Sequence, residues 1–289
     1  MEQPLDGIRA VSLATNLPGP AAAMRLRRLG AKMVKVEPPA GDALARANRA
    51  CYDHLTAGQE IVTLDLKLPE DRARLDAYLE ASDLLLTAHR TTPLERLGLG
   101  WTELHARFPR LCQVAIVGRF APNDNVPGHD LNFQAAWGLL TPPHMPKTLV
   151  ADLGAAERAV AAALGLLLAR ERGGEAGYAQ VSIEEAAQTF ALPLTYRLTV
   201  DGPLSGALPS YRLYRTRDDY IALAALEPHF LQRLQDGLNV ERVTHETLER
   251  IFETRTALEW ENWARERDIP ITALRMDPTR ANTSSEGHC

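Results

Sequence analysis

The chain has 289 residues and a formal net charge of −5, and its lysine and arginine residues are spread along the sequence. A nucleic-acid-binding protein normally gathers its basic residues on one face, so this distribution argues against nucleic acid as a partner. No apolar run approaches the roughly 18–20 residues that span a bilayer, and the N-terminal residues lack the pattern of a signal peptide. The three cysteines show no metal-ligand spacing. Together these features predict a cytoplasmic protein without a membrane segment or a metal site.

The first part of the chain has a β-α-β pattern. Short apolar segments that read as strands are bounded by Gly, Pro and Asn. The helical segment after the first of them begins at Pro20 and stops at Gly30, as helix-terminus preferences require. Short strands that alternate with helices favour a parallel sheet covered on both faces, the α/β class. Strands are expected at residues 8–13, 32–37, 61–66, 83–87 and 111–117, and helices at residues 20–29 and 69–81.

The carboxyl ends of these strands are the expected place for a ligand, because ligands of open α/β sheets bind there. The loops expected at these ends are residues 15–20, 37–42, 89–93 and 118–129. The turn after the first strand contains Asn16 and Leu17 and does not match the GxGxxG pattern of dinucleotide-binding proteins. We nevertheless expect it to bring backbone amides close to a ligand.

The composition changes after Gly173, which predicts a second, smaller domain. Residues 1–199 are expected to form the large domain, with a further strand at 179–183 and an Ala-rich helix. Residues 200–210 are rich in Gly and Pro and read as a linker. Residues 276–289 are polar, show no periodic pattern and are predicted to be disordered. The small α+β domain at 211–275 is expected to hold a hairpin (211–216 and 220–224), helices at 228–238, 244–253 and 257–266, and a strand at 269–274.

Two titratable residues lie at the expected beginnings of two helices. His129 follows Pro127-Gly128, and Asp152 opens an Ala/Leu-rich helix that runs to about residue 170. Groups at two helix N-termini joined by one loop are able to face each other across a cleft, and the helix dipole favours a charged carboxylate there. The structural alternative is that Asp130 and Asp152 are N-terminal caps and His129 is a turn residue.

Eight short motifs stand in order along the chain: Pro4-Leu5-Asp6-Gly7-Ile8-Arg9, Leu17-Pro18-Gly19-Pro20, Val34-Lys35-Val36-Glu37 with Gly41-Asp42, Leu64-Asp65-Leu66-Lys67, Glu95-Arg96-Leu97-Gly98-Leu99-Gly100, Gly128-His129-Asp130, Ala151-Asp152-Leu153 and Tyr211-Arg212-Leu213-Tyr214-Arg215-Thr216. From residue 4 to about residue 275 they resemble the class III CoA-transferase family (the CaiB/BaiF group). The resemblance implies a Rossmann-like large domain, a small domain and a homodimer whose chains are interlinked. It implies an acyl-CoA thioester as substrate and no prosthetic group.

The resemblance also separates two chemistries. Transferases of the family use the aspartate that matches Asp152 as a nucleophile and form a mixed anhydride with the acyl group. The α-methylacyl-CoA racemase branch pairs a histidine in a Gly-His-Asp motif with that aspartate and adds a glutamate in a Glu-Pro motif. His129, Asp152 and Glu227 match these three positions. Glu227 is equally consistent with a helix-cap carboxylate before Pro228.

The resemblance therefore implies an acyl-CoA racemase or epimerase, which inverts the α-carbon of a 2-methyl-branched acyl-CoA through an enolate. Inversion next to a thioester needs one base on each face of the carbon. Two alternatives stay open at this point. One is a CoA-transferase with Asp152 as its nucleophile, and the other is a divergent scaffold with weakened CoA binding.

The divergent alternative follows from departures from the family pattern. A basic stretch typical of the family is replaced by Thr56-Ala57-Gly58-Gln59-Glu60-Ile61, and its Glu-Arg-Pro motif reads Glu37-Pro38-Pro39. Arg90 and Arg96 remain as cations for the CoA phosphates, and Arg119 is expected either to replace a lost cation or to block the site. The resemblance adds Asn16, Leu17 and Gly128 as CoA-binding residues. A C-terminal region shorter than is typical leaves interlinking open, while dimerisation is expected.

Overall fold

The computed structural model describes residues 3–275, so the tail expected at residues 276–289 lies outside the described residues. The chain divides into two compact units, with the division between Ala191 and Leu192. The first unit is an α/β domain, and the second unit contains the small antiparallel sheet described below. The linker expected at residues 200–210 contains a short π-helix, η1 (Pro203–Ala207).

A six-stranded parallel sheet forms the centre of the first unit, in the order β3-β2-β1-β4-β5-β6. The α/β fold with a parallel sheet is thereby confirmed. In register, Val11 of β1 lies between Val34 of β2 and Leu85 of β4. The strands are β1 (Arg9–Ser12), β2 (Lys32–Glu37), β3 (Glu60–Thr63), β4 (Leu84–Thr87), β5 (Cys112–Val117) and β6 (Tyr178–Ser182).

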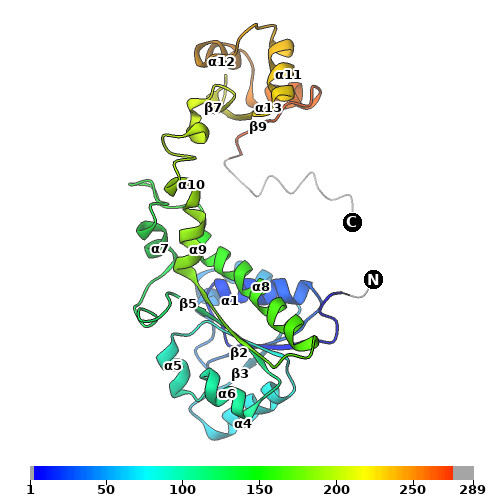
Figure 1. The fold of residues 1–289 in the computed structure, drawn as a ribbon, viewed down its shortest axis with the longest axis vertical. Coiled ribbons are helices and arrows are strands. Elements are labelled where there is room, and N and C mark those ends of the chain that lie inside the picture. The colour runs from blue at the N-terminus through cyan, green and yellow to red at the C-terminus, as the bar shows by residue number, and fades with distance from the viewer. Residues whose placement is uncertain (1–2, 276–289) are drawn as a thin grey trace. The chain divides into compact units, whose positions relative to one another are not determined.

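Helices cover both faces of the sheet because neighbouring strand residues point to opposite sides. Ala10 belongs to the core beneath α1 and α8, whereas Val11 belongs to the core beneath α4, α5 and α6 (Figure 1). The helices on the first face are α1 (Pro18–Arg28), α3 (Arg49–Thr56) and α8 (Val150–Glu171), and those on the second face are α4 (Pro69–Glu80), α5 (Thr91–Arg96) and α6 (Trp101–Arg107). The central strands β4 and β5 are buried on both sides, as their continuous apolar sequences predict, whereas the edge strand β3 is largely exposed.

The strand order reverses between β1 and β4, because β2 and β3 extend the sheet on one side of this pair and β5 and β6 on the other. The turn after β1 and the loop after β4 therefore diverge. Such a switch point leaves a crevice at the carboxyl ends of the strands, where ligands of this class of sheet bind. Thr15 and Asn16 come from the first of these segments, and His89 comes from the second.

Two short helices lie in a segment for which no element is expected from the sequence pattern. They follow polar capping residues: Asp42 caps α2 (Ala43–Ala47) and Asn48 caps α3, each by accepting a backbone N–H. The remaining elements of the first unit are α7 (Asp130–Ala136) and α9 (Ile183–Phe190).

Over residues 192–275, the second unit contains a three-stranded antiparallel sheet with three helices of eight or more residues, which agrees with the expected α+β class (Figure 1). Its core packs Tyr214 on Phe252 and Phe252 on Trp260, with ring centroids 5.2 and 5.1 Å apart. The elements are α10 (Leu192–Thr195), β7 (Tyr211–Arg215), β8 (Tyr220–Ala224), α11 (Pro228–Leu238), α12 (His245–Phe252), α13 (Ala257–Arg265) and β9 (Ile271–Ala273).

Candidate active site

His129 is the N-cap residue of α7, and its backbone is extended. The side-chain oxygen of Asn132 accepts a hydrogen bond from the His129 backbone N–H at 3.0 Å. This contact satisfies a polar group at the helix terminus without using the imidazole ring. His129 is exposed at the N-terminus of α7.

Asp130 joins α7 to α8. Its Oδ1 accepts the backbone N–H of Asp152 at 3.0 Å, and its Oδ2 accepts the side-chain amide of Gln134. Gln134 also donates to the carbonyl of Thr148 at 3.1 Å. Asp130 is 3% exposed, so these bonds compensate a buried carboxylate. Asp130 therefore accepts a free backbone N–H in the first turn of α8 and not one in its own helix, α7.

Asp152 lies inside the first turn of α8. The helix begins at Val150, two residues before its expected start at Asp152, and its N-cap is Leu149, so Asp152 is not a capping residue. Burial and, to a smaller extent, the nearby charge of Asp130 raise the pKa of Asp152 to about 7. The helix dipole favours the charged form, but desolvation and the neighbouring carboxylate outweigh it. Both protonation states of Asp152 are thus populated near neutral pH.

One cavity of about 420 Å³ lies at the carboxyl ends of β1, β4 and β5. The residues proposed from the sequence that line it are Asn16, Arg90, Gly128, His129 and Asp152. His129 and Asp152 thus face the same cavity from α7 and α8. Such a cavity suits a small ligand that reacts between an imidazole and a carboxyl group.

Three residues proposed from the sequence lie elsewhere. Leu17 packs against the core beside α1, and Arg96 is exposed in the last turn of α5; neither lines the described cavities at the switch point. Glu227 belongs to the second unit, where it is the exposed N-cap residue of α11 and makes no side-chain capping hydrogen bond. Arg90 donates to the carbonyl of Asn125 at 3.3 Å.

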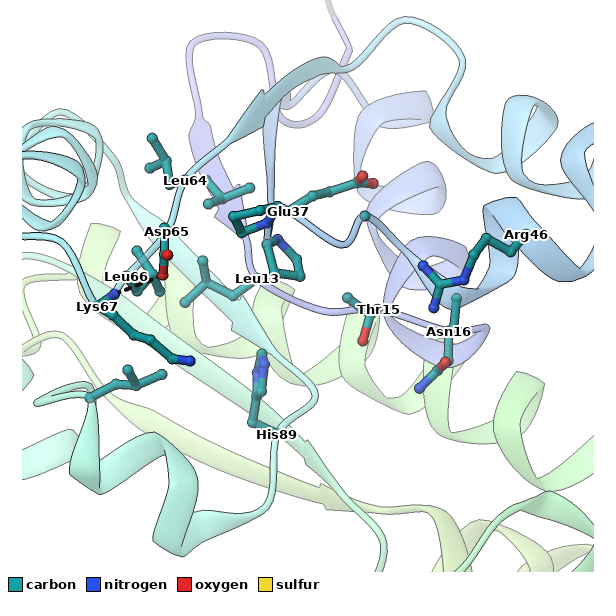
Figure 2. A pocket seen from close by; sticks show the side chains of 16 residues that line it. Leu13, Thr15, Asn16, Glu37, Arg46, Leu64, Asp65, Leu66, Lys67 and His89 are labelled. Atoms are coloured by element: carbon teal, nitrogen blue, oxygen red, sulfur yellow. Dashed lines mark hydrogen bonds between the residues drawn. The ribbon is translucent and has the colours of Figure 1, made fainter.

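A second cavity of about 450 Å³ adjoins the first, and Thr15, Asn16 and His89 line both. Figure 2 shows Arg46 and Lys67 on opposite sides of this second cavity. Both side chains are exposed at its mouth. The sequence analysis did not propose either as a ligand-binding cation, although Lys67 stands in one of the quoted motifs and Arg46 follows another by four residues.

His89 lines both cavities, and Figure 2 shows it among the residues of the second cavity. Burial lowers the pKa of His89, which favours a neutral imidazole near neutral pH. Its Nδ1 atom is buried and has no partner among the described residues. A bound ligand is able to supply that missing hydrogen bond.

Arg119 neither lines these two cavities nor blocks them. Its Nε donates to Glu184 at 3.0 Å, and its guanidinium lies 4.9 Å from the ring centroid of Phe133. The expectation that Arg119 replaces a lost cation or obstructs the site finds no support in this arrangement. Within residues 3–275, no cluster of His, Cys, Asp and Glu is arranged to hold a metal ion, and no helix is long and apolar enough to cross a bilayer.

Comparisons with known proteins agree with this architecture. Residues 5–282 match the model of CoA-transferase family III. The α-methylacyl-CoA racemase of Homo sapiens is 32% identical over 259 residues, which are 82% of this chain and 65% of the racemase. The probable fatty acyl-CoA transferase Rv3272 of Mycobacterium tuberculosis is 30% identical over 268 residues, which are 80% of this chain and 68% of that protein. The chain thus matches about two thirds of the length of these two relatives.

The likeness extends to three dimensions. The crystal structure of the hypothetical protein Rv3272 from Mycobacterium tuberculosis superposes with a TM-score of 0.83 at 27% identity, and the match covers 98% of this chain and 89% of that structure. A CaiB/BaiF family protein from Brucella suis has the same fold, with a TM-score of 0.80 at 21% identity.

Proposed function

The chain belongs to CoA-transferase family III, and from this premise we propose that it is an acyl-CoA racemase or epimerase that inverts the α-carbon of a 2-methyl-branched acyl-CoA. The observation that carries the proposal is the pairing of His129 and Asp152 in one cavity at the switch point of the sheet. The relatives include a racemase and a probable transferase, so the choice between the two rests on the site of this chain.

The two side chains supply the two bases that inversion requires. One base removes the α-proton, and the electron pair of the C–H bond moves into the thioester carbonyl to form a planar enolate. The conjugate acid of the other base then returns a proton to the opposite face. Which of His129 and Asp152 acts first depends on the enantiomer bound. A group with a pKa near 7 suits this task, because it accepts and releases protons readily at neutral pH.

The transferase alternative gives less of the site a part. A carboxylate that attacks a thioester must be ionised, and burial lowers the ionised fraction of Asp152 at neutral pH. His129 would also have no defined part in forming an aspartyl anhydride. The transferase reading stays the second candidate, because a probable fatty acyl-CoA transferase is among the relatives.

The two adjoining cavities suggest how the CoA thioester lies. We place the thioester carbon in the cavity of His129 and Asp152 and the phosphate-bearing end of CoA in the cavity of Arg46 and Lys67. Those two cations would take the place of the basic residues missing at 56–61. Each charge-assisted hydrogen bond to a phosphate contributes on the order of 1.5–3 kcal/mol before screening by salt.

Glu227 and the homodimer remain proposals from the sequence. Glu227 is proposed to hold the histidine or to complete the acid network. Glu227→Gln is then expected to lower kcat, and an unchanged kcat would remove Glu227 from the mechanism. Light scattering at working concentration tests the dimer, and a monomer mass would contradict it.

The experiment that tests the two-base mechanism uses two variants, His129→Gln and Asp152→Asn. Each is incubated in D₂O with the separate enantiomers of 2-methylbutanoyl-CoA. Removal of one base abolishes inversion, with an expected loss of about 10²–10⁴-fold. Each variant should still exchange the α-proton of one enantiomer for deuterium without inverting the carbon. The two variants should do so for opposite enantiomers. Asp152→Asn preserves the backbone contact with Asp130, which uses the Asp152 N–H. Inversion by either variant at close to the wild-type rate, or the same enantiomer labelled by both, would contradict the proposal.

A further inference from the structure

We propose that Lys35 and Asp42 are positioning residues, and that their buried ion pair holds the turn that forms the common wall of the two cavities. The inference rests on the proposed function, because it concerns binding of the CoA thioester. Neither residue lines a described cavity, so any effect on the ligand must pass through the segments that the two residues hold.

The ion pair is fully enclosed. Lys35 Nζ lies 2.8 Å from Asp42 Oδ2, and the two side chains are 1% and 0% exposed. Lys35 comes from β2, whereas Asp42 is the N-cap of α2, and its Oδ1 accepts the Leu44 N–H at 2.9 Å. A buried ion pair contributes little net stability, because desolvation offsets its attraction. The geometry that the pair imposes is therefore the more important consequence.

Each partner also holds the backbone after β1. Lys35 Nζ donates to the carbonyl of Ala14 at 2.9 Å, and Asp42 Oδ1 accepts the backbone N–H of Asn16 at 3.0 Å. The turn is thus held at both ends. Thr15, between these two anchors, and Asn16 itself line both cavities.

The turn needs such a hold because its backbone is strained. Asn16 has a φ of 65°, in the left-handed region that favours glycine. The other side of the turn is blocked by α1, since a Cβ atom added to Gly19 would lie 2.1 Å from the Ala14 Cβ. The turn is therefore fixed between the helix on one side and the ion pair on the other.

A second carboxylate completes the cluster. Lys35 Nζ lies 3.5 Å from Glu37 Oε1, which accepts the Tyr52 hydroxyl at 2.7 Å. Burial raises the pKa of Tyr52, so its hydroxyl remains a donor. Glu37 lines the cavity of Arg46 and Lys67, which connects the cluster to the proposed phosphate end of the site.

The test compares Asn16→Gly with Asn16→Ala, each with and without Asp42→Ala. The two substitutions at residue 16 differ by one Cβ atom, and only glycine takes a positive φ freely. With Asp42 intact, the Asn16→Gly and Asn16→Ala proteins should bind 2-methylbutanoyl-CoA with equal dissociation constants in calorimetry. With Asp42→Ala, the Asn16→Gly protein should bind about five- to tenfold more tightly than the Asn16→Ala protein. Asp53→Ala is the matched control, because Asp53 pairs with Arg49 at the surface.

Kinetics separate positioning from a purely structural role. Asp42→Ala in the otherwise unchanged chain should raise KM about five- to tenfold and leave kcat nearly constant, since the turn contacts the ligand before and during reaction. A purely structural role would lower the folded fraction and leave KM unchanged. If Asp42→Ala does not fold, Lys35→Met takes its place, because it removes the contact with Ala14.

Two outcomes would overturn the inference. One is an equal dissociation constant for Asn16→Gly and Asn16→Ala in the Asp42→Ala (or Lys35→Met) background. The other is an unchanged KM for Asp42→Ala. A wild-type protein that binds no CoA thioester would instead overturn the proposed function, so the two failures are distinguishable.

Discussion

Replacement of Asp152 by asparagine is expected to stabilise the protein at neutral pH. Burial raises the pKa of Asp152 from 3.8 to about 7. Between these values the folded state holds a proton that the unfolded chain has lost, so the free energy of unfolding falls as pH rises through this window. The full shift of about three units corresponds to about 4 kcal/mol. Because the residue is only half-buried, solvent screening reduces this to about 1–2 kcal/mol.

The assay is urea unfolding followed by far-ultraviolet circular dichroism at several pH values between about 4 and 8. Asp152→Asn should match the wild type near pH 4 and exceed it by about 1–2 kcal/mol above pH 7, with a Tm higher by about 2–8 °C. Asp53→Asn serves as the control, because Asp53 lies at the surface. Parallel pH dependence of Asp152→Asn and wild type would refute the reasoning.

Three further predictions follow from the site. The rate of deuterium exchange for the enantiomer whose proton Asp152 removes should rise with pH and level off above about 7, because only the ionised carboxyl accepts a proton; a flat profile would contradict this. Lys67→Ala and Arg46→Ala should each weaken CoA binding several-fold, more at low salt than at high salt, whereas Arg96→Ala should not; equal effects of all three would contradict the placement of CoA. Gly19→Ala should cost about 1–3 kcal/mol in urea unfolding, because its Cβ would lie 2.1 Å from a Cβ of the turn after β1; an unchanged free energy of unfolding would contradict the packing described.

The sheet could be predicted from the sequence because its strands are short apolar runs between Gly, Pro and Asn. β2 (Lys32–Glu37) falls at its predicted position, and the other strands of the large sheet differ by one to three residues at their ends. The clearest difference is β3, expected to reach residue 66, which ends at Thr63. After Thr63 the chain forms a wall of the cavity of Arg46 and Lys67, which Leu64 and Asp65 line. The local pattern could not show where strand pairing stops.

The chemistry of the site depended on contacts that no local pattern contains. The structural alternative made Asp130 an N-terminal cap, but its side chain accepts the backbone N–H of Asp152, 22 residues away. The raised pKa of Asp152 comes from burial in the folded chain, which reverses the effect expected from the helix dipole. The positive φ of Asn16 also has no sequence signature, because asparagine in a turn is common without it.

The cations at the second cavity show a different limit. Sequence reasoning looked for arginine at the positions of the family pattern and proposed Arg90 and Arg96. The structure instead places Arg46 and Lys67 at this cavity, on segments that the strand order brings together. Parallel strands bring loops that are far apart in sequence together at one edge of the sheet. The position of these two cations could therefore be read only from the folded structure.

The most direct test of the proposed function is deuterium incorporation by the wild-type protein. A single enantiomer of 2-methylbutanoyl-CoA is incubated in D₂O without any free-acid acceptor, and both the label at Cα and the enantiomeric ratio are followed by mass spectrometry and chiral chromatography. A two-base racemase gains deuterium at Cα and approaches an equal mixture of enantiomers. In a parallel incubation with an added free acid, transfer of CoA onto that acid with no deuterium at Cα would contradict the account and favour the transferase.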